Sequence, residues 1–228
     1  MARRRRAVGT SLFAGLLLAS GLGFGSPASA IATSPGDVFP IETRGANSQP
    51  LRASNGPVWA WMATKDDGSP VRWNACSTIT WNWNKGKSRD LKVMRKAVKN
   101  LSKASGIAFT QTSTSPDVNI RYSKEPRAQG ALGLGGFRYT GGGQSAQIVQ
   151  GSIDIDKKLK KKKSKKQFSK SIRKELFMHE WGHVVGLDHV DSRKELMYPS
   201  VGGYLKNYGT GDREGLRILG DRAGCSPA

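Results

Sequence analysis

The stretch "HEWGHVVGLDH", residues 179–189, contains all three histidines of a chain of 228 residues. His179 and His183 are four residues apart, so on a helix they project from one face about one turn apart. Two imidazole nitrogens in that arrangement can each lie roughly 2.0–2.1 Å from one zinc ion. The spacing therefore predicts a helix that carries two metal ligands.

His189 can reach the same ion only if the helix ends before it. Six further helical residues would carry it roughly 9 Å along the axis, away from His183. Gly186 lies between them, and glycine readily adopts the left-handed conformation that ends helices. We therefore predict a helix over residues 169–185, a break at Gly186, and a turn that returns His189 to the metal.

Glu180 follows His179 directly and points about 100° around the helix from it, so it is not expected to bind the same ion. A carboxylate beside a metal-held water can accept a proton from that water as it attacks a carbonyl, which makes Glu180 the candidate general base. A single histidine or glutamate on a helix is more commonly solvated or packed in the core. That simpler interpretation does not explain three histidines at this spacing together with the glutamate and the glycine.

The same stretch matches the H-E-x-x-H-x-x-G-x-x-H motif of the metzincin zinc metalloproteases. "KELMYPS", residues 194–200, resembles the methionine turn of the matrixin branch, and "GDREGLRILG", residues 211–220, resembles the helix that closes a matrixin domain. The resemblance extends by element order over about residues 73–220. It implies a matrixin-like, peptidase M10-type catalytic domain.

This resemblance implies one catalytic zinc ion and a role for each residue of the motif. Glu180 would be the general base, and Met197 would pack beneath the metal. The implied zinc ligands are His179, His183 and His189. The implied fold is an α/β (α+β) domain with a twisted, mostly parallel sheet, two long helices, and a small C-terminal subdomain with a third helix.

The sequence departs from the matrixin pattern at several positions. Val190 follows the third histidine, where matrixins usually have serine. The residues after Pro199 do not match the usual wall of the specificity pocket, so substrate preference does not transfer. No histidine is left for a second, structural zinc, and residues 31–75 contain no cysteine that could act as a propeptide switch.

The first thirty residues have the layout of a secretory signal peptide. A basic run at residues 3–6 precedes an apolar stretch at 12–24, and the small residues 28–30 predict cleavage near Ala30. A membrane anchor is the weaker alternative, and the export route stays open. Cleavage would remove four arginines and no acidic residue, which lowers the net charge from +20 to +16. We expect a strongly basic, secreted protein.

Residues 31–57 contain four prolines and no sustained apolar period, which predicts a flexible leader or short propeptide. The catalytic domain is then expected over residues 58–228. Its two cysteines, Cys76 and Cys225, predict a disulfide in an exported protein. The alternatives are two free thiols, or one thiol that acts on the metal.

The remaining elements follow from periodicity and from turn residues. Residues 71–84 alternate like a half-buried strand, and the glycine-rich stretch 130–143 is expected to form a mobile loop. The other expected elements are a helix that begins near Ser88 and ends before Gly106, strands over 107–112, 117–123 and 147–156, and a last helix over 212–219.

Lys157–Lys166 includes eight lysines and has too little apolar surface to pack. It is expected to be a solvated insertion; the alternative is a site for an anionic polymer or surface. No aromatic residue is interleaved with the lysines, so no specific nucleic-acid partner is predicted. Calcium binding by the glycine-rich stretch or by Asp154 and Asp156 is left open and has no support in the sequence.

The function predicted from these patterns is that of a secreted zinc endopeptidase that acts on protein or peptide substrates, as a monomer. The main alternative is a basic zinc-binding domain for adhesion at a cell surface, with weak or no proteolysis. A metal-dependent hydrolase for a substrate other than peptide is a further alternative. An intact Glu180 favours an enzyme.

Overall fold

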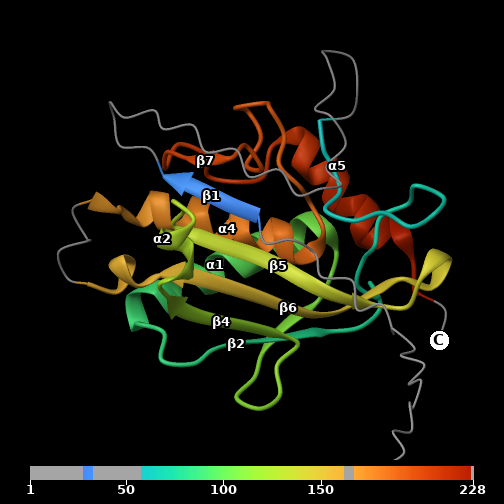
Figure 1. The fold of residues 1–228 in the computed structure, drawn as a ribbon, viewed down its shortest axis with the longest axis horizontal. Coiled ribbons are helices and arrows are strands. Elements are labelled where there is room, and N and C mark those ends of the chain that lie inside the picture. The colour runs from blue at the N-terminus through green and yellow to red at the C-terminus, as the bar shows by residue number, and fades with distance from the viewer. Residues whose placement is uncertain (1–27, 33–57, 162–166, 227–228) are drawn as a thin grey trace, which may run out of the picture.

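The computed structural model describes residues 28–32, 58–161 and 167–226 (Figure 1). Most of the predicted signal peptide and leader lies outside these ranges, as does the second half of the lysine run. Those assignments therefore stay predictions. No helix within the described ranges is long and apolar enough to cross a membrane.

A five-stranded mixed sheet forms the body of the domain, in the order β3-β2-β4-β6-β5. The first four strands in this order are parallel, and β5 runs antiparallel to β6. The α/β fold with a mostly parallel sheet is thus confirmed. The strands are β2 (Ile79–Trp83), β3 (Phe109–Gln111), β4 (Val118–Ser123), β5 (Gly133–Thr140) and β6 (Gln147–Asp156).

Two long helices, α1 (Ser88–Ser105) and α4 (Lys170–Val185), pack side by side and against the sheet. The Ser169 hydroxyl caps α4 by accepting a hydrogen bond from the Ile172 amide at 3.2 Å. A third helix, α5 (Thr210–Leu219), lies in the C-terminal part (Figure 1). The short helices are α2 (Glu125–Ala128), η1 (Gly143–Ser145), η2 (Lys157–Lys160) and η3 (Asp221–Ala223).

Two tryptophans of β2, Trp81 and Trp83, fill the space between the sheet and α4. Trp81 meets Trp181 edge to face at a centroid distance of 6.3 Å, and Trp83 meets Phe177 in the same way at 5.4 Å. All four side chains are buried. This packing fixes α4 against the sheet and thereby positions its histidines.

The prediction of one strand over residues 71–84 was wrong in its first half. A turn at Asn74–Ser77, closed by a 3.1 Å hydrogen bond from the Ser77 amide to the Asn74 carbonyl, interrupts it, and β2 begins only at Ile79. The turn carries Cys76, and the alternating pattern hides it because the buried residues on either side keep the same parity.

The mobile loop predicted for residues 130–143 was also wrong, because most of this stretch forms β5. Its first five residues are buried. The glycines allow the strand to lie unusually close to α4, as described below for the site. Glycine has no side chain, so the first half of this strand lacks the alternation of apolar and polar residues by which a strand is recognised in a sequence.

Two short strands extend the sheet beyond β5. β1 (Ala28–Ala32) pairs antiparallel with β5, and β7 (Ser200–Val201) pairs parallel with β1 (Figure 1). β1 therefore lies between β5 and β7, with a hydrogen-bonded neighbour on each side.

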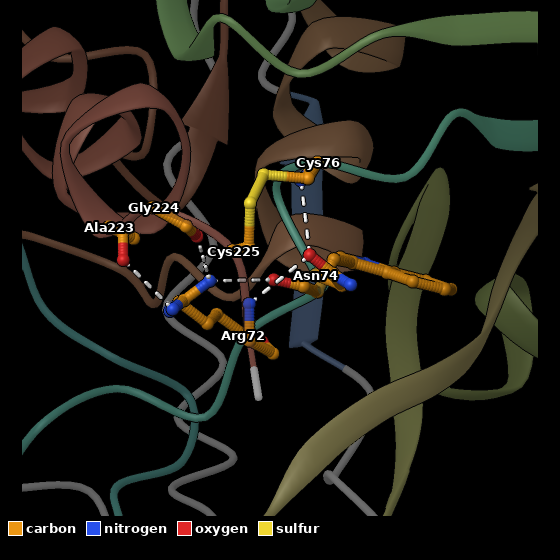
Figure 2. The surroundings of a disulfide bond; sticks show 8 residues. Arg72, Asn74, Cys76, Ala223, Gly224 and Cys225 are labelled. Atoms are coloured by element: carbon orange, nitrogen blue, oxygen red, sulfur yellow. Dashed lines mark hydrogen bonds between the residues drawn. A yellow bond between two sulfur atoms is a disulfide. The ribbon is translucent and has the colours of Figure 1, made fainter. Parts of the chain in front are cut away.

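A disulfide joins Cys76 to Cys225, as predicted, across 149 positions of the sequence (Figure 2). Arg72 reinforces this connection, because its guanidinium donates hydrogen bonds to the carbonyls of Ala223 and Gly224 at 3.0 and 3.1 Å. The end of the chain is thus held to the segment that leads into β2.

Candidate active site

The three histidines converge at one point. His179 and His183 lie on α4, and His189 lies on the loop that follows it. Their Nε2 atoms form a triangle with sides of 3.0, 3.1 and 3.2 Å. A triangle of this size has a point about 2 Å from every corner and about 1 Å off its plane, which matches the bond length of a zinc ion with three imidazole ligands.

Backbone carbonyls fix the protonation of two of these rings. Nδ1 of His179 lies 2.8 Å from the Leu196 carbonyl, and Nδ1 of His183 lies 2.8 Å from the Leu187 carbonyl. A carbonyl can only accept, so each Nδ1 carries the proton and each Nε2 presents a lone pair to the centre of the triangle. Lone pairs that converge in this way repel one another unless a cation lies among them. The donor set therefore fits zinc.

Burial keeps all three imidazoles neutral. It lowers the pKa of His179 to about 4 and that of His189 to about 3, and it holds the pKa of His183 well below its usual range. Metal binding requires neutral imidazole. The protein therefore presents the metal-binding form of each ring at neutral pH.

The turn that returns His189 is built as its spacing requires. α4 ends at Val185, and Gly186 adopts a left-handed conformation with φ 117°. The Leu187 amide then donates to the Gly182 carbonyl at 2.9 Å, and the Asp188 amide donates to the Ala60 carbonyl at 2.8 Å. The second bond ties the histidine loop to the segment around Ala60.

Met197 lies against the turn of α4 between the two helical histidines. A Cβ added at Gly182 would lie 2.3 Å from the Met197 sulfur, so only glycine permits this approach. The Val190 amide donates to the Met197 carbonyl at 3.1 Å, which joins the methionine turn to the third histidine.

A buried carboxylate that the sequence analysis did not single out supports this turn. Asp212 of α5 accepts hydrogen bonds from the amides of Leu196, at 2.5 Å, and Met197, at 3.3 Å. The carbonyl of the same Leu196 accepts from His179, so one residue links Asp212 to a predicted ligand. Asp212 is the third residue of α5 and also caps its N-terminus at Gly209, at 2.9 Å. An acidic residue at the third position of a predicted helix is typical of an N-terminal cap, so the sequence alone could have singled out Asp212 as a structural residue.

Glu180 is fully buried, and neither of its carboxylate oxygens has a hydrogen-bond partner among the described residues. Burial raises its pKa well above the usual range, and the nearby Gly135 amide offsets this only in part. A buried carboxylate without a partner is rare in folded proteins and needs a reason. A general base whose partner is a water molecule and a substrate supplies such a reason.

Strand β5 crosses α4 at Glu180 with almost no clearance. A Cβ at Gly133 would lie 2.4 Å from the Glu180 carboxylate, and one at Gly135 would lie 2.2 Å from the Glu180 carbonyl. The contact at Gly135 is with backbone and therefore requires glycine, whereas a side chain at Gly133 would have to displace the Glu180 carboxylate. β1 pairs with these same residues, Ala30 opposite Gly133 and Ala28 opposite Gly135, and it also contacts α4. An extended stretch of polypeptide thus fits between β5 and β7, beside Glu180.

A third buried carboxylate, Glu175, holds the loop that follows β7. It lies one turn before His179 on α4 and accepts hydrogen bonds from the amides of Gly202 and Leu205, both at 3.1 Å. Tyr204 projects from this loop with 80% of its surface exposed. The helix that carries the histidines therefore also fixes the loop beyond β7.

The two aspartates considered for calcium are already paired with arginines. Asp154 accepts two hydrogen bonds from Arg121, and Asp156 accepts two from Arg127. Within the described ranges, the histidine triad is the one group of three or more potential ligands close enough to hold a metal. The structure thus gives no support for calcium at these aspartates.

The described part of the lysine run, residues 157–161, continues from β6 into η2. Leu159 is buried, whereas the four lysines are exposed. Two of them cover aromatic rings, Lys158 at 5.7 Å from the centre of Phe168 and Lys160 at 5.6 Å from that of Tyr122. Residues 162–166 lie outside the described residues, so an anionic partner for the run stays a prediction.

The site thus combines two candidate ligands on one helix, a third beyond a glycine break and a methionine packed against that helix, within an α/β domain. The Matrixin family model, peptidase family M10, matches residues 72–217, well over half of the chain. The chain therefore belongs to the matrixins, which are zinc metalloendopeptidases. A search of curated proteins finds no significant match.

Proposed function

We propose that this matrixin is a secreted zinc endopeptidase. One observation carries the proposal: the histidine triad and Glu180 lie beside a sheet edge that accommodates an extended strand of polypeptide. Strand addition to a sheet edge is a general way to bind peptide through its backbone. The arrangement favours a peptide substrate over the alternative hydrolase and over the alternative adhesion domain.

In this proposal, His179, His183 and His189 hold one zinc ion. The ion, when bound, polarises a water molecule and the carbonyl of the peptide bond to be cleaved. Glu180 accepts a proton from that water during the attack and delivers a proton to the departing amine. Its raised pKa favours the first of these transfers, because a more basic carboxylate takes up the proton more readily.

Several other groups would keep this arrangement in place. The carbonyls of Leu187 and Leu196 orient two of the rings, and Met197 fills the space against α4. Partners of this kind commonly affect metal affinity by about 10–100-fold. Asp212 holds the Leu196 amide, and the Leu196 carbonyl in turn orients the His179 ring. Asp212 is therefore a positioning residue in this scheme.

We also propose the predicted division of the chain: a signal peptide over residues 1–30, a leader or short propeptide over 31–57, and the catalytic domain over 58–228. Matrixins are generally extracellular, and the Cys76–Cys225 disulfide is of the kind that forms outside the reducing cytosol. Both support export.

The function can be tested by digesting a peptide library with the purified wild-type protein and with Glu180→Ala. We expect cleavage products from the zinc-loaded wild-type protein and none from the variant. A chelator should abolish the activity, and added zinc should restore it. Elemental analysis should find one zinc per chain in both proteins.

If the zinc-loaded wild-type protein cleaves nothing that Glu180→Ala leaves intact, the protease assignment fails. A zinc content far below one per chain would instead remove the metal centre. A protein that binds zinc, cleaves nothing and adheres to cells would support the adhesion alternative.

A further inference from the structure

A second groove lies at the far edge of the sheet, between α1 and β3. It encloses about 510 Å³, and its apolar lining comes from Trp81, Val98 and Phe109. Three sheet strands, β2, β4 and β6, separate β3 from β5. At about 4.8 Å per strand spacing, the two edges are roughly 19 Å apart, so this groove is separate from the active site.

Three cations line the groove from the side of α1. Arg95, Lys99 and Lys103 occur at intervals of four residues, so they form one stripe with a spacing of about 6 Å along the helix. All three are exposed, and none forms an ion pair within the part of the chain that the structure describes. The one acidic residue of α1, Asp90, is buried and bound to Arg173 at 3.0 Å. The stripe thus has no counter-charge on its own helix.

The strand on the other side of the groove has an open edge. β3 ends the sheet and pairs only with β2 within the described ranges. The Ile79 amide donates to the Ala108 carbonyl at 2.9 Å, and the Thr112 amide donates to the Trp81 carbonyl at 3.0 Å. Backbone groups alternate in direction along a strand, so those of Phe109 and Gln111 face away from β2. An added strand could bind them.

Arg95 spans the groove from α1 to this edge. Its Nε donates to the Gln111 side-chain oxygen at 3.0 Å, which places the guanidinium beside the open backbone of β3. The groove therefore combines apolar lining, three cations in a row and unpaired strand backbone. A phosphate or sulfate polymer would use only the cations, whereas a polypeptide with acidic side chains would use all three features.

We propose that this groove binds an extended, acidic segment of a polypeptide, which adds to the open edge of β3 and directs its carboxylates toward Arg95, Lys99 and Lys103. The site depends on neither zinc nor Glu180. It would hold a partner or substrate protein at a distance from the bond that is cleaved, and it would act even in a chain without peptidase activity.

The probe for this site is a fluorescent peptide of five Glu-Thr repeats, titrated against the Glu180→Ala protein so that cleavage cannot interfere. We expect saturable binding that weakens as salt rises, because the contacts are ionic. The matching peptide of five Gln-Thr repeats should bind at least about tenfold more weakly, since charge-assisted hydrogen bonds to carboxylates are lost. Equal binding of the two peptides contradicts the proposal.

The groove is identified by comparing two triple substitutions with the same loss of charge. Arg95→Gln, Lys99→Gln and Lys103→Gln together should weaken binding of the Glu-Thr peptide at least about tenfold. A control triple on exposed cations elsewhere should weaken it less than about threefold, since long-range attraction is screened. The control substitutions are Lys124→Gln, Lys157→Gln and Arg217→Gln. Equal losses would mean that net charge alone binds the peptide, and would overturn the proposal.

Strand addition is tested at Gln111. Gln111→Pro removes the outward amide without removing a hydrogen bond to β2, and proline is tolerated on sheet edges. Gln111→Val removes the same side chain but keeps the amide. We expect the proline variant to bind the peptide several-fold more weakly than the valine variant, with the same thermal stability for both.

Linear polyphosphate serves as the competing occupant. If polyphosphate binds more tightly than the peptide, loses affinity with the groove triple and is indifferent to Gln111→Pro, the groove is a polyanion site and the proposal is wrong. Peptide binding that depends on both the stripe and the Gln111 amide supports it.

Discussion

The two edges of the five-stranded sheet are built in opposite ways. At β5 the strand lies so close to the backbone of α4 that Gly135 admits no side chain, and β1 pairs along it. At β3 the strand is three residues long, its outer edge is open, and α1 places cations beside it. In the two proposals above, the first edge binds a polypeptide through its backbone, and the second also selects the polypeptide by its charge.

The two sides also differ in how they are held. Close packing and buried carboxylates fix the catalytic side, where Asp212 supports the methionine turn and Glu175 supports the loop after β7. A different device, a disulfide, holds the segment before β2 to the last residues that the structure describes. This difference implies that stability and activity can be changed separately.

Removal of the disulfide should have the largest effect, and the effect should be on stability. The bridge closes a loop of 149 positions, so replacing Cys76 and Cys225 by serine should lower the free energy of unfolding by about 4–5 kcal/mol in the chain-entropy estimate. Denaturant unfolding of the two proteins measures the change. Activity per folded molecule at low temperature should be unchanged. An activity loss without a stability loss would contradict this separation.

Glu180→Gln should have the opposite profile. The amide cannot accept a proton, so peptide cleavage should fall by roughly 10²–10⁴-fold. The free energy of unfolding should be unchanged or higher, because the substitution preserves volume and removes a buried carboxylate that has no partner among the described residues. Zinc content, measured on the same sample, should stay at one per chain. Retained activity would rule out the proposed role of this residue.

Gly135→Ala should affect both properties, because it enlarges the closest contact between β5 and α4. The added methyl group would lie 2.2 Å from the Glu180 carbonyl, so the strand must move. We expect the free energy of unfolding to fall by about 3 kcal/mol, and activity to fall with it.

Gly142→Ala is the matched control, because a methyl group added there would have no atom of a non-adjacent residue within 4 Å. It should change stability by less than about 0.5 kcal/mol. Equal stability of the two alanine variants would show that β5 does not require its glycines.

The smallest expected effect is a pH dependence at Asp212. Burial raises the pKa of this carboxyl from 3.8 to about 6, so the folded protein binds its proton more tightly than the unfolded chain does. Between these values the folded state carries more protons, and the free energy of unfolding therefore falls as pH rises from about 4 to 6.

Asp212→Asn removes this contribution. The difference in unfolding free energy between wild type and variant should shift by roughly 1–2 kcal/mol across that window, to the disadvantage of the wild type at the higher pH. Chemical denaturation at four pH values measures the shift. If the wild type instead gains stability relative to Asp212→Asn as the pH rises, the pKa of Asp212 is not raised in the folded protein.

The histidine triad could be predicted from sequence because the constraint is local. Two ligands one turn apart and a glycine before the third fix most of the geometry within eleven residues. The disulfide was equally accessible, since the chain has only two cysteines. The helices could be predicted from the helical spacing of their apolar residues and from the residues that begin and end them. The observed bounds of α1 and α4 lie within one residue of the predicted ones.

The glycine-rich strand could not be predicted in the same way. Gly135 is required, and Gly133 is favoured, by contact with Glu180, which lies more than forty residues later in the chain. The supporting carboxylates have the same character: Glu175 and Asp212 act on backbone amides of distant loops, and those partners become visible only when the chain is folded. Local patterns thus located the histidine triad, whereas the surroundings of Glu180 depend on long-range packing.

The position of β1 has a consequence for the order of events during maturation. The predicted cut near Ala30 falls inside this strand, between the residues that pair with β5 and those that pair with β7. One cut would split five residues into two shorter segments, each with pairing on only one side. A chain that folds before it is cut would fill the space between β5 and β7 with its own residues 28–32, and the cut would then be the step that frees this space.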